Sequence, residues 1–334
     1  MQLGVLVVGC GNIAGRFDHD RVDTDTPFTH AGAYARHGSF AIKACVEPNQ
    51  QTRESFMKRW GVAAGFSSLT EALDAGLSVD VVSVCSPTSA HFDDLLAALK
   101  FSPKLVFCEK PVAQRLAQTE LMVERCHQQG VMLAVNYTRR WDPTLIRLIT
   151  EIRSGAWGKL RCINGVYNKG VLNNGSHLVD LLHLLFRELE IAHAGPGCVD
   201  MWPEDPSVPA FLIGDRAVPV MLNVSDARDY SLFEVQFVTE RGVISMEEGG
   251  LRWRFRMAQD SPTFANYKAL GSDQQQSGTL GQATLAAVAE IYNAVRHAGD
   301  LSSTGDNALK AQRICEALLA RSLACSHSLE STHV

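Results

Sequence analysis

Three small residues near the start of the chain have a spacing that suits phosphate binding. Gly9, Gly11 and Ala14 follow an apolar run in "LGVLVVGCGNIAG". In a strand–turn–helix unit, this spacing lets the backbone turn tightly and approach a dinucleotide pyrophosphate, which the helix N–H groups then bind. Asn12 and Ile13 lie within the turn, so we expect them to contact the cofactor as well. The pattern predicts a dinucleotide-binding site.

An acidic residue ends the second apolar run. Glu47 follows the run 40–46, where a carboxylate can accept hydrogen bonds from an adenosine ribose. It lies 33 residues after Ala14, whereas about 20 is usual. The aspartate-rich "RFDHDRVDTDTPF" between them predicts an inserted loop over about 18–28, with helix resuming near Thr29, and we expect this loop to edge the cleft or a subunit contact. Because a carboxylate repels a 2′-phosphate, NAD is favoured over NADP.

Two later segments place polar and charged groups at the ends of apolar runs. "VCSPTSAH" brings Ser86, Pro87 and His91 to the end of one run, and "FCEKP" brings Glu109 and Lys110 to the end of another. The carboxyl ends of parallel strands meet at one edge of a doubly wound sheet, where ligands bind. We therefore expect both segments at the ligand-binding edge.

The elements that carry these motifs alternate along the first part of the chain. Short runs rich in Val, Leu, Ile and Ala are typical of parallel strands buried on both faces. They span residues 3–8, 40–46, 79–85, 104–108 and 131–135. Helix-like stretches lie between them, which predicts an α/β fold with an N-terminal Rossmann domain, a doubly wound parallel sheet, over residues 1–121.

The sequence pattern changes after residue 155. Candidate strands then follow one another, with one strong candidate helix, 175–187, among them. These strands span 159–167, 190–200, 218–223, 230–239, 242–247 and 251–257. Helical stretches at 280–297 and 306–325 close the chain. The pattern predicts a C-terminal α+β domain over residues 122–334, built on a largely antiparallel open sheet.

Bulk composition excludes several classes of partner. The 334-residue chain is 46% hydrophobic and 20% charged, with a net charge of −5. Because no Lys/Arg cluster appears, nucleic acid and anionic membrane surfaces are discounted as partners. The nine cysteines are scattered without a CxxC pair, which favours a reducing cytoplasm. No apolar run approaches the ~18 residues of a membrane span, and the opening run is interpreted as a buried strand rather than a signal sequence.

Taken in order, the motifs resemble those of the Gfo/Idh/MocA family of oxidoreductases. The matching segments are GCGNIA, SPTSAH, EKP, "VNYTRRWDP" at 135–143, "NNGSHLVDLLH" at 173–183 and "STGDNALKAQRICEALLARS". The resemblance covers essentially the whole chain. It implies an NAD(P)-dependent enzyme acting on a sugar, cyclitol or nucleotide-linked sugar. It also implies that the domain over residues 122–334 serves substrate binding and oligomerisation, in a homodimer or homotetramer.

The resemblance also implies a role for each matching residue. Lys110 is the lysine that approaches both the nicotinamide and the reacting substrate oxygen. Glu109 helps to hold the cofactor, and His177 exchanges a proton with the substrate hydroxyl. The residues implied to flank the cofactor are Ser86, Pro87 and His91.

Side-chain chemistry supports these implied roles. Oxidation of a secondary alcohol needs a hydride acceptor, a base for the hydroxyl proton and a positive group for the developing alkoxide. Histidine titrates near neutral pH, and a lysine beside the cofactor supplies charge. One departure is Asn173, where many relatives carry an aspartate; an amide can hydrogen-bond a hydroxyl but bears no charge. We therefore expect a catalytic dyad of Lys110 and His177 rather than a triad.

Substrate contacts are expected from Asn173 and from three other side chains. Asp180 follows His177 by three residues on the same helix, where it can orient the ring or bind substrate. Arg140 either is an ordinary surface charge or reaches a substrate phosphate or carboxylate, and Lys169 is a weaker candidate of the same kind. We expect no metal site, because His177, Asp180 and a third candidate, the histidine at position 183, spread too widely around the helix.

Two other functions stay open at this point. One is an NAD-dependent glycosidase that uses transient oxidation to labilise a glycosidic bond; some members of the family resemble such an enzyme. The other is a non-catalytic NAD-binding regulator. An intact EKP tripeptide and His177 favour the oxidoreductase, because a decayed site would lose one of them.

Overall fold

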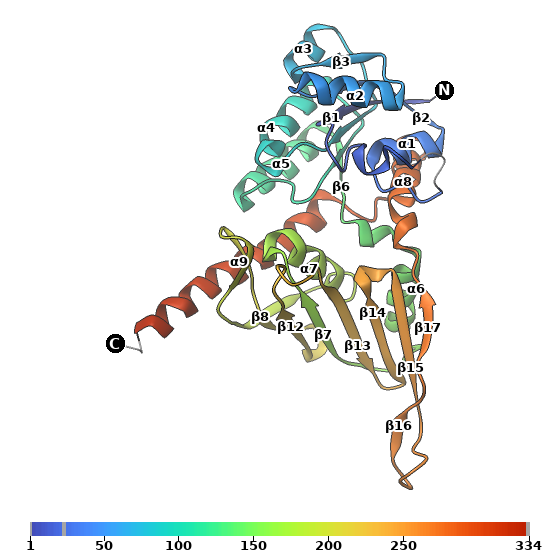
Figure 1. The fold of residues 1–334 in the computed structure, drawn as a ribbon, viewed down its shortest axis with the longest axis vertical. Coiled ribbons are helices and arrows are strands. Elements are labelled where there is room, and N and C mark those ends of the chain that lie inside the picture. Colours follow the sequence, from blue (N-terminus) through green and yellow to red (C-terminus); the bar gives the residue numbers. More distant parts are fainter. Residues whose placement is uncertain (1, 22–24, 332–334) are drawn as a thin grey trace. The chain divides into compact units, whose positions relative to one another are not determined.

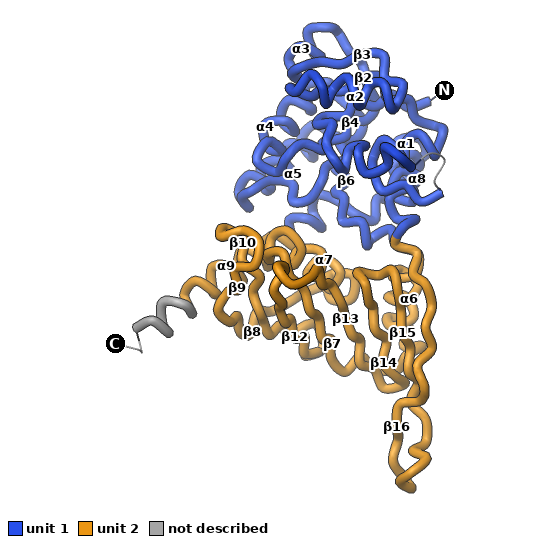
Figure 2. Tube along the Cα trace, in the orientation of Figure 1, with its two compact units in different colours: residues 1–142, 281–309 blue, residues 143–280, 310–334 orange. Residues whose placement is uncertain are grey.

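The structure is a computed structural model that describes residues 2–21 and 25–331, with side chains described as far as residue 324. The chain forms two compact units (Figure 2). Unit 1 comprises residues 1–142 and 281–309, and unit 2 comprises residues 143–280 and 310–334. Residues 122–142 and 281–309, which the sequence assigns to the second domain, therefore pack with the first unit.

Unit 1 is built on a six-stranded parallel sheet in the order β3-β2-β1-β4-β5-β6 (Figure 1). The strands are β1 (Leu3–Val8), β2 (Phe40–Val46), β3 (Ala64–Phe66), β4 (Val81–Val84), β5 (Leu105–Cys108) and β6 (Met132–Val135). Every residue of β1, β4 and β5 is buried, as expected where helices cover both faces. The strand order reverses beside β1, which confirms the predicted doubly wound sheet.

Six described α-helices lie wholly within unit 1. They are α1 (His30–His37), α2 (Gln50–Trp60), α3 (Leu69–Asp74), α4 (Thr88–Ala98), α5 (Leu116–Gln129) and α8 (Ala283–His297). Side chains of Thr29, Asn49 and Ser68 accept backbone N–H groups at the starts of α1, α2 and α3. Because α8 packs on α1 and β6 pairs with β5, the unit extends beyond residue 121.

Unit 2 contains a nine-stranded sheet in the order β16-β15-β14-β13-β7-β12-β11-β8, with β17 paired to β15. The strands are β7 (Leu160–Tyr167), β8 (Leu189–Ala194), β11 (Ala210–Gly214), β12 (Val218–Val224), β13 (Phe233–Thr239), β14 (Gly242–Glu247), β15 (Arg252–Asp260), β16 (Lys268–Leu270) and β17 (Gln274–Ser277). Among these described strands only β7 and β12 pair in parallel, so the predicted, largely antiparallel sheet is confirmed.

Three helices accompany this sheet, and one strand prediction is wrong. The helices are α6 (Pro143–Arg153), α7 (Ser176–Leu182) and α9 (Gly305–Ser331). The expected single strand over 190–200 is two strands, because the segment Gly195–Gly197 interrupts it. Its second half is β9 (Cys198–Trp202), which pairs with β10 (Asp205–Ser207) in a separate two-stranded sheet. Within the described part of the chain, no helix has both the length and the apolar character needed to cross a membrane.

Candidate active site

The glycine-rich turn after β1 has the geometry that a dinucleotide needs. Gly9 adopts a left-handed φ of 82°, and a Cβ there would lie 2.6 Å from the backbone nitrogen of Ser86. A Cβ at Gly11 would meet no atom within 4 Å, so the backbone at this residue borders open space. The first glycine is thus required by the turn, and the second leaves room for a close approach. The residues present fit a bound dinucleotide.

The inserted segment interrupts the helix that should follow this turn, and two backbone hydrogen bonds join the turn to α1 across the interruption. The backbone N–H of His30 donates to the carbonyl of Ile13 at 3.1 Å, and that of Ala31 donates to Ala14 at 2.9 Å. In an uninterrupted α-helix the N–H that reaches Ile13 belongs to the fourth residue after it, Phe17. His30 takes that place, so the segment 17–29 is spliced in. Without this segment, Glu47 would follow Ala14 at a separation of about 20 residues, which is typical of the fingerprint.

The start of the insertion differs in detail from its prediction. The sequence predicts helix from Asn12 to about Phe17; the structure has a wide turn, in which the Phe17 N–H reaches the Asn12 carbonyl at 3.1 Å. A short 3-10 helix, Arg16–Asp18, follows. Helix resumes at α1 with Thr29 as its N-cap, as predicted. Residues 22–24 of the expected loop lie outside the described part.

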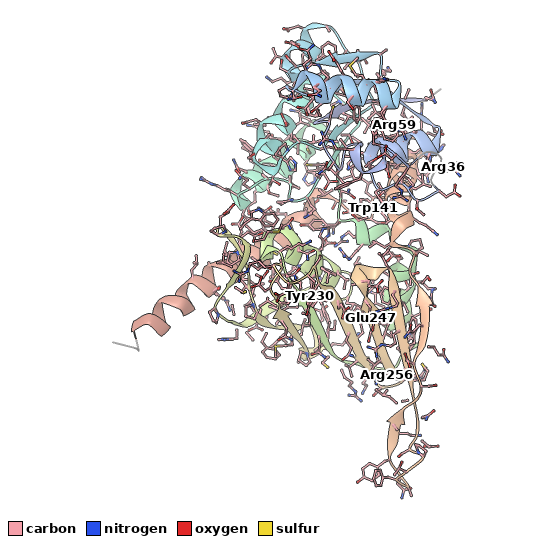
Figure 3. The ribbon with its side chains drawn as sticks, viewed as in Figure 1. Arg36, Arg59, Trp141, Tyr230, Glu247 and Arg256 are labelled. Atoms are coloured by element: carbon pink, nitrogen blue, oxygen red, sulfur yellow. The ribbon has the colours of Figure 1, made fainter. Side chains whose placement is uncertain are left out.

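A buried carboxylate closes the insertion onto α1. Asp18 is fully buried and accepts the N–H of Phe28 at 2.9 Å, and both the N–H and the hydroxyl of Thr29 at 2.8 and 2.7 Å. The side chain of Arg59 on α2 donates to the carbonyls of His19 and Asp18 (Figure 3). The insertion is therefore held at its base by α1 and α2.

Glu47 is fixed beside the turn by two backbone donors. Its Oε2 accepts the N–H of Cys10 at 3.0 Å, and its Oε1 accepts that of Asn49 at 3.0 Å. Each carboxylate oxygen keeps further acceptor capacity. Glu47 therefore both positions the turn and presents negative charge where the ribose of an adenosine binds in this fold.

The Glu109–Pro111 tripeptide follows β5 at the carboxyl edge of the sheet, and its Lys110–Pro111 peptide bond is cis. The Oε1 atom of Glu109 accepts Nε2 of His30 at 2.9 Å and Nδ2 of Asn136 at 2.6 Å. Burial acts to raise the pKa of Glu109, but hydrogen bonds from His30 and Asn136, with the charges of His30 and Lys110, bring it below its usual value. The carboxylate beside Lys110 is thus held ionised.

His91 holds two loops and does not lie open to a ligand. It is 1% exposed, with Nδ1 2.8 Å from the Pro111 carbonyl and Nε2 2.8 Å from the Ser86 carbonyl. The predicted cofactor contact of this ring therefore becomes an indirect one through the two loops. Ser86 is half-buried and Pro87 is exposed at the start of α4, so both lie at the same sheet edge as Lys110.

Arg140 has a structural contact within unit 1. The side chain is 6% exposed, and its Nη1 donates to the Ser302 carbonyl at 3.1 Å. The neighbouring Trp141 donates its indole N–H to Glu290 on α8 at 2.9 Å (Figure 3). These contacts tie the segment after β6 to α8 and to the chain that follows it.

In unit 2, a loop of unusual backbone shape leads into α7. Lys169 and Gly170 adopt left-handed φ angles of 64° and 78°. The Lys169 N–H donates to Oδ2 of Asp200 at 2.7 Å, and the N–H groups of Leu172 and Asn173 donate to the two oxygens of Asp205 at 2.8 and 2.9 Å. The carboxylates of Asp200 and Asp205 thus fix the backbone of the loop.

This loop presents the predicted substrate residues together. The Asn173 amide donates to the Lys169 carbonyl at 3.1 Å, and the Ser176 hydroxyl at the start of α7 donates to the Asn173 carbonyl at 3.1 Å. His177 is half-buried on α7, whereas Asp180 is 1% exposed. The burial of Asp180 fits a role in holding the helix better than one in direct substrate contact.

A hollow of about 810 Å³ in unit 2 is lined by none of these residues. It lies at the opposite end of β7 from the Lys169 loop, between apolar side chains such as Leu160 and Phe186 and the exposed cations Lys159 and Arg216. Volume alone is therefore a poor guide to the site in this chain.

The structure thus gathers two sets of residues, one in each unit. Unit 1 brings the turn, Glu47, the Ser86–Pro87 turn and Lys110 to one sheet edge, and unit 2 brings Lys169, Asn173 and His177 onto one loop and helix. Sequence reasoning missed the residues that hold them. These are His30, Asn136, Asp200 and Asp205. Asn136 lies within the "VNYTRRWDP" segment and could have been found there; the others carry no motif.

Comparisons with known proteins agree with this geometry. Residues 3–137 match the GFO_IDH_MocA family model, described as an oxidoreductase family with an NAD-binding Rossmann fold. D-glucoside 3-dehydrogenase of Escherichia coli (strain K12) is 25% identical over 267 residues, or 75% of this chain and 69% of that protein. Myo-inositol 2-dehydrogenase of Thermotoga maritima is 37% identical over 120 residues, or 36% and 35% of the two chains.

A solved structure extends the likeness of fold to both units. The WlbA dehydrogenase of Bordetella pertussis, in complex with NADH and UDP-GlcNAcA, has a TM-score of 0.76 at 18% identity, covering 96% of this chain and 97% of that one. The family model covers the Rossmann unit, and this match adds the open sheet that follows it. Residues 3–137 thus carry the NAD-binding Rossmann unit of the Gfo/Idh/MocA oxidoreductase family, and the fold of the chain as a whole matches that of the WlbA dehydrogenase.

Proposed function

We propose that the protein interconverts a secondary hydroxyl and a ketone on a sugar, cyclitol or nucleotide-linked sugar, with NAD as hydride acceptor or donor. One observation carries this proposal: the glycine turn, Glu47 and Lys110 follow β1, β2 and β5 at the same edge of one parallel sheet. Ligands of doubly wound sheets bind at that edge. The names of the relatives, which act on a glucoside and on inositol, support the substrate class.

Lys110 supplies positive charge for the reacting oxygen. Bound NAD supplies the hydride acceptor or donor, whereas the protein must stabilise the charge that develops on oxygen. Glu109 is held ionised next to Lys110, and an adjacent negative charge favours the protonated form of an amine. We therefore assign Lys110 as an ammonium donor to the substrate oxygen.

His177 takes or returns the hydroxyl proton at a ring nitrogen. It is half-buried at the start of α7, the position that the Asp205-anchored loop fixes. Lys169 and Asn173 on that loop are proposed to hydrogen-bond neighbouring substrate groups. Asp180 and Arg140 are proposed substrate residues with a weaker basis, because both are nearly buried.

A panel of sugars, cyclitols and nucleotide sugars tests the proposal. Each is offered with NAD and with NADP, and nicotinamide absorbance is followed for the wild type, Lys110→Met and His177→Asn. General acid–base groups contribute about 10²- to 10⁴-fold, so each variant should lose at least about 100-fold in kcat. Lys104→Met is the control, because Lys104 lies at the other end of β5 and pairs with Asp80 at 3.0 Å.

The same panel separates the other functions. Cleavage of a glycoside without net NADH would point to a glycosidase that oxidises its substrate transiently. NAD binding with no turnover of any compound, in wild type as in the variants, would contradict the proposal. An oxidoreductase gives NADH in proportion to ketone formed.

We further propose that the protein is a homodimer or homotetramer built through one face of the unit 2 sheet. A Cβ at Gly165 would lie 2.8 Å from Leu178, so α7 packs on the face to which this glycine belongs. The opposite face has a shallow hollow of about 220 Å³. It is lined by half-buried and buried side chains, including Asn164, Val166, Glu234, Gln236, Ser245, Glu247 and Arg254 (Glu247 is labelled in Figure 3).

Light scattering on size-exclusion fractions tests this assembly. Val166→Lys places a charge in the middle of the proposed contact and should convert the oligomer to a monomer. Gln276→Lys on the exposed β17 is the control, because Gln276 pairs with Trp253 and so belongs to the other face of the sheet; it should leave the mass unchanged. A monomeric wild type would contradict the proposal. We propose a cytoplasmic location on the scattered cysteine usage, which fractionation would test.

A further inference from the structure

Two buried histidines of unit 1 hold the residues directly before and after Lys110. Nε2 of His30 on α1 lies 2.9 Å from the carboxylate of Glu109, and Nδ1 of His91 on α4 lies 2.8 Å from the carbonyl of Pro111. The two rings are 0% and 1% exposed. We infer that His30 and His91 are positioning residues that together fix the place of the Lys110 ammonium. The inference rests on the proposed role of Lys110.

The His30 ring is fixed at both nitrogens and on one face. Its Nδ1 lies 2.7 Å from the Ser83 hydroxyl, which in turn lies 3.1 Å from the Tyr34 hydroxyl. The ring stacks on Phe107 of β5 with centroids 4.3 Å apart. A ring held in this way cannot turn, so the Glu109 carboxylate that it binds is held as well.

The His91 ring joins the loop after β5 to the turn after β4. Besides the Pro111 carbonyl, it contacts the Ser86 carbonyl through Nε2 at 2.8 Å. Both contacts are hydrogen bonds at the same time only when both ring nitrogens carry a proton. His91 therefore sets the separation between the two loops at the ligand edge.

Such positioning matters because catalysis is sensitive to small displacements. Misplacing a reacting group by about 1 Å can cost about 100-fold in rate. Glu109 and Lys110 lie beyond the last residue of β5, so the strand ladder ends before them. Removing either histidine contact frees one end of the tripeptide while the sheet stays intact.

Substitutions can remove one contact of each ring and keep the other. The amide nitrogen of asparagine lies near the Nδ1 position of histidine, and that of glutamine lies near Nε2. At position 30, His30→Gln keeps the donor to Glu109, whereas His30→Asn keeps the contact with Ser83. At position 91 the pattern is reversed: His91→Asn keeps the donor to Pro111, and His91→Gln keeps that to Ser86.

The expected result is a crossed pattern. His30→Asn and His91→Gln should lose about 10- to 100-fold in kcat, whereas His30→Gln and His91→Asn should stay within about threefold of the wild type. KM for NAD should change little in His30→Gln, which keeps the contact with Glu109 and leaves the glycine turn, Glu47 and the Ser86–Pro87 turn untouched. His37→Asn is the control: His37 lies on α1 and packs on Phe40 and Tyr292, away from the tripeptide.

A cofactor-free measurement accompanies the kinetics. The rate at which acetic anhydride modifies Lys110 in the apo protein, read by mass spectrometry against Lys104, should change in His30→Asn and His91→Gln only. The inference is overturned if kcat is higher in the asparagine variant than in the glutamine variant at both positions, or lower at both positions. It is also overturned if kcat and labelling follow thermal stability in all variants.

These readouts separate the inference from the proposed function. Suppose that Lys110→Met keeps full activity while the labelling rate of Lys110 changes only in His30→Asn and His91→Gln. The positioning role of the histidines then stands, and the catalytic role of Lys110 is wrong. If Lys110→Met is inactive while neither kcat nor labelling is crossed, only the inference about the histidines is wrong.

Discussion

Replacing Asp18 with alanine removes the acceptor that closes the inserted segment onto α1. The fully buried carboxylate takes hydrogen bonds from the Phe28 N–H at 2.9 Å, the Thr29 N–H at 2.8 Å and the Thr29 hydroxyl at 2.7 Å. Thr29 is also the N-cap of α1, through the N–H of Gly32 at 3.1 Å. The variant therefore leaves three donors without their acceptor and loosens the start of the helix.

The size of the effect follows from these contacts. A hydrogen bond to a charged group contributes about 1.5–3 kcal/mol. Three donors share one carboxylate and their contributions do not add fully, so Asp18→Ala should lower the free energy of unfolding by about 4 kcal/mol. Asp18→Asn keeps one acceptor oxygen but turns an NH₂ group toward backbone donors, and should cost about 2 kcal/mol.

Urea unfolding, followed by tryptophan fluorescence, measures this loss. Trp60 reports on the region, since the guanidinium of Arg59 lies 4.3 Å from its ring centroid. Asp25→Asn is the matched control from the same insertion: Asp25 pairs with Arg36 (labelled in Figure 3), but its side chain is 82% exposed. Exposed pairs contribute little, so that variant should unfold like the wild type.

The insertion also bears on cofactor binding. Because α1 donates to the carbonyls of Ile13 and Ala14 in the cofactor turn, Asp18→Ala should weaken NAD binding by about tenfold, or ~1.4 kcal/mol, in calorimetry. An equal free energy of unfolding and equal NAD affinity in Asp18→Ala and Asp25→Asn would refute the idea that Asp18 fixes the inserted segment to α1.

Three further predictions follow from single contacts. Glu47→Ala should weaken NAD binding and narrow the preference for NAD over NADP by at least about tenfold, because the charge that holds the Cys10 N–H and repels a 2′-phosphate is lost. Calorimetry with both cofactors measures the two affinities, and an unchanged preference would contradict this prediction. Gly170→Ala places a Cβ 2.1 Å from Oδ2 of Asp205 at a φ of 78°, so kcat/KM for the sugar should fall about tenfold or more with NAD affinity unchanged; normal kinetics would contradict the loop assignment. The lowered pKa of Glu109 means that its contribution to stability is present above the unfolded pKa and is lost as the pH falls through the folded pKa. Urea unfolding of Glu109→Gln should therefore differ from the wild type most at neutral pH, and a gap that widens on acidification would contradict the sign.

The sheet of unit 1 could be predicted from the sequence because of how it is buried. Parallel strands covered on both faces form continuous apolar runs, and β1, β4 and β5 are buried at every residue. The short β3 was not predicted, because a three-residue strand has no periodicity to detect.

The insertion shows where the sequence was sufficient and where it was not. Its existence followed from the separation between Ala14 and Glu47, which is longer than the usual ~20 residues. Its bounds, 17–29, follow only from the hydrogen bonds that His30 and Ala31 make back to the turn. Those bonds join residues distant in the chain, and no local pattern encodes them.

The residues that hold the site were hidden for the same reason. His30 and Glu109 are separated by 79 positions, and Lys169 and Asp200 by 31. A buried histidine or aspartate without a motif looks like any other in the sequence. Chemistry-bearing residues could be found because their types and spacing are restricted, whereas supporting residues need only reach the right atom in the folded chain.

Single-turnover transfer of deuterium tests the central claim most directly. The substrate found in the panel is deuterated at the reacting carbon and mixed with excess enzyme and NAD, and the nicotinamide product is analysed by mass spectrometry. We predict that the wild type transfers the deuterium to NAD, whereas Lys110→Met binds NAD with similar affinity but transfers at least about 100-fold more slowly. Product ketone without labelled NADH, or equal transfer rates in Lys110→Met and the wild type, would contradict the account.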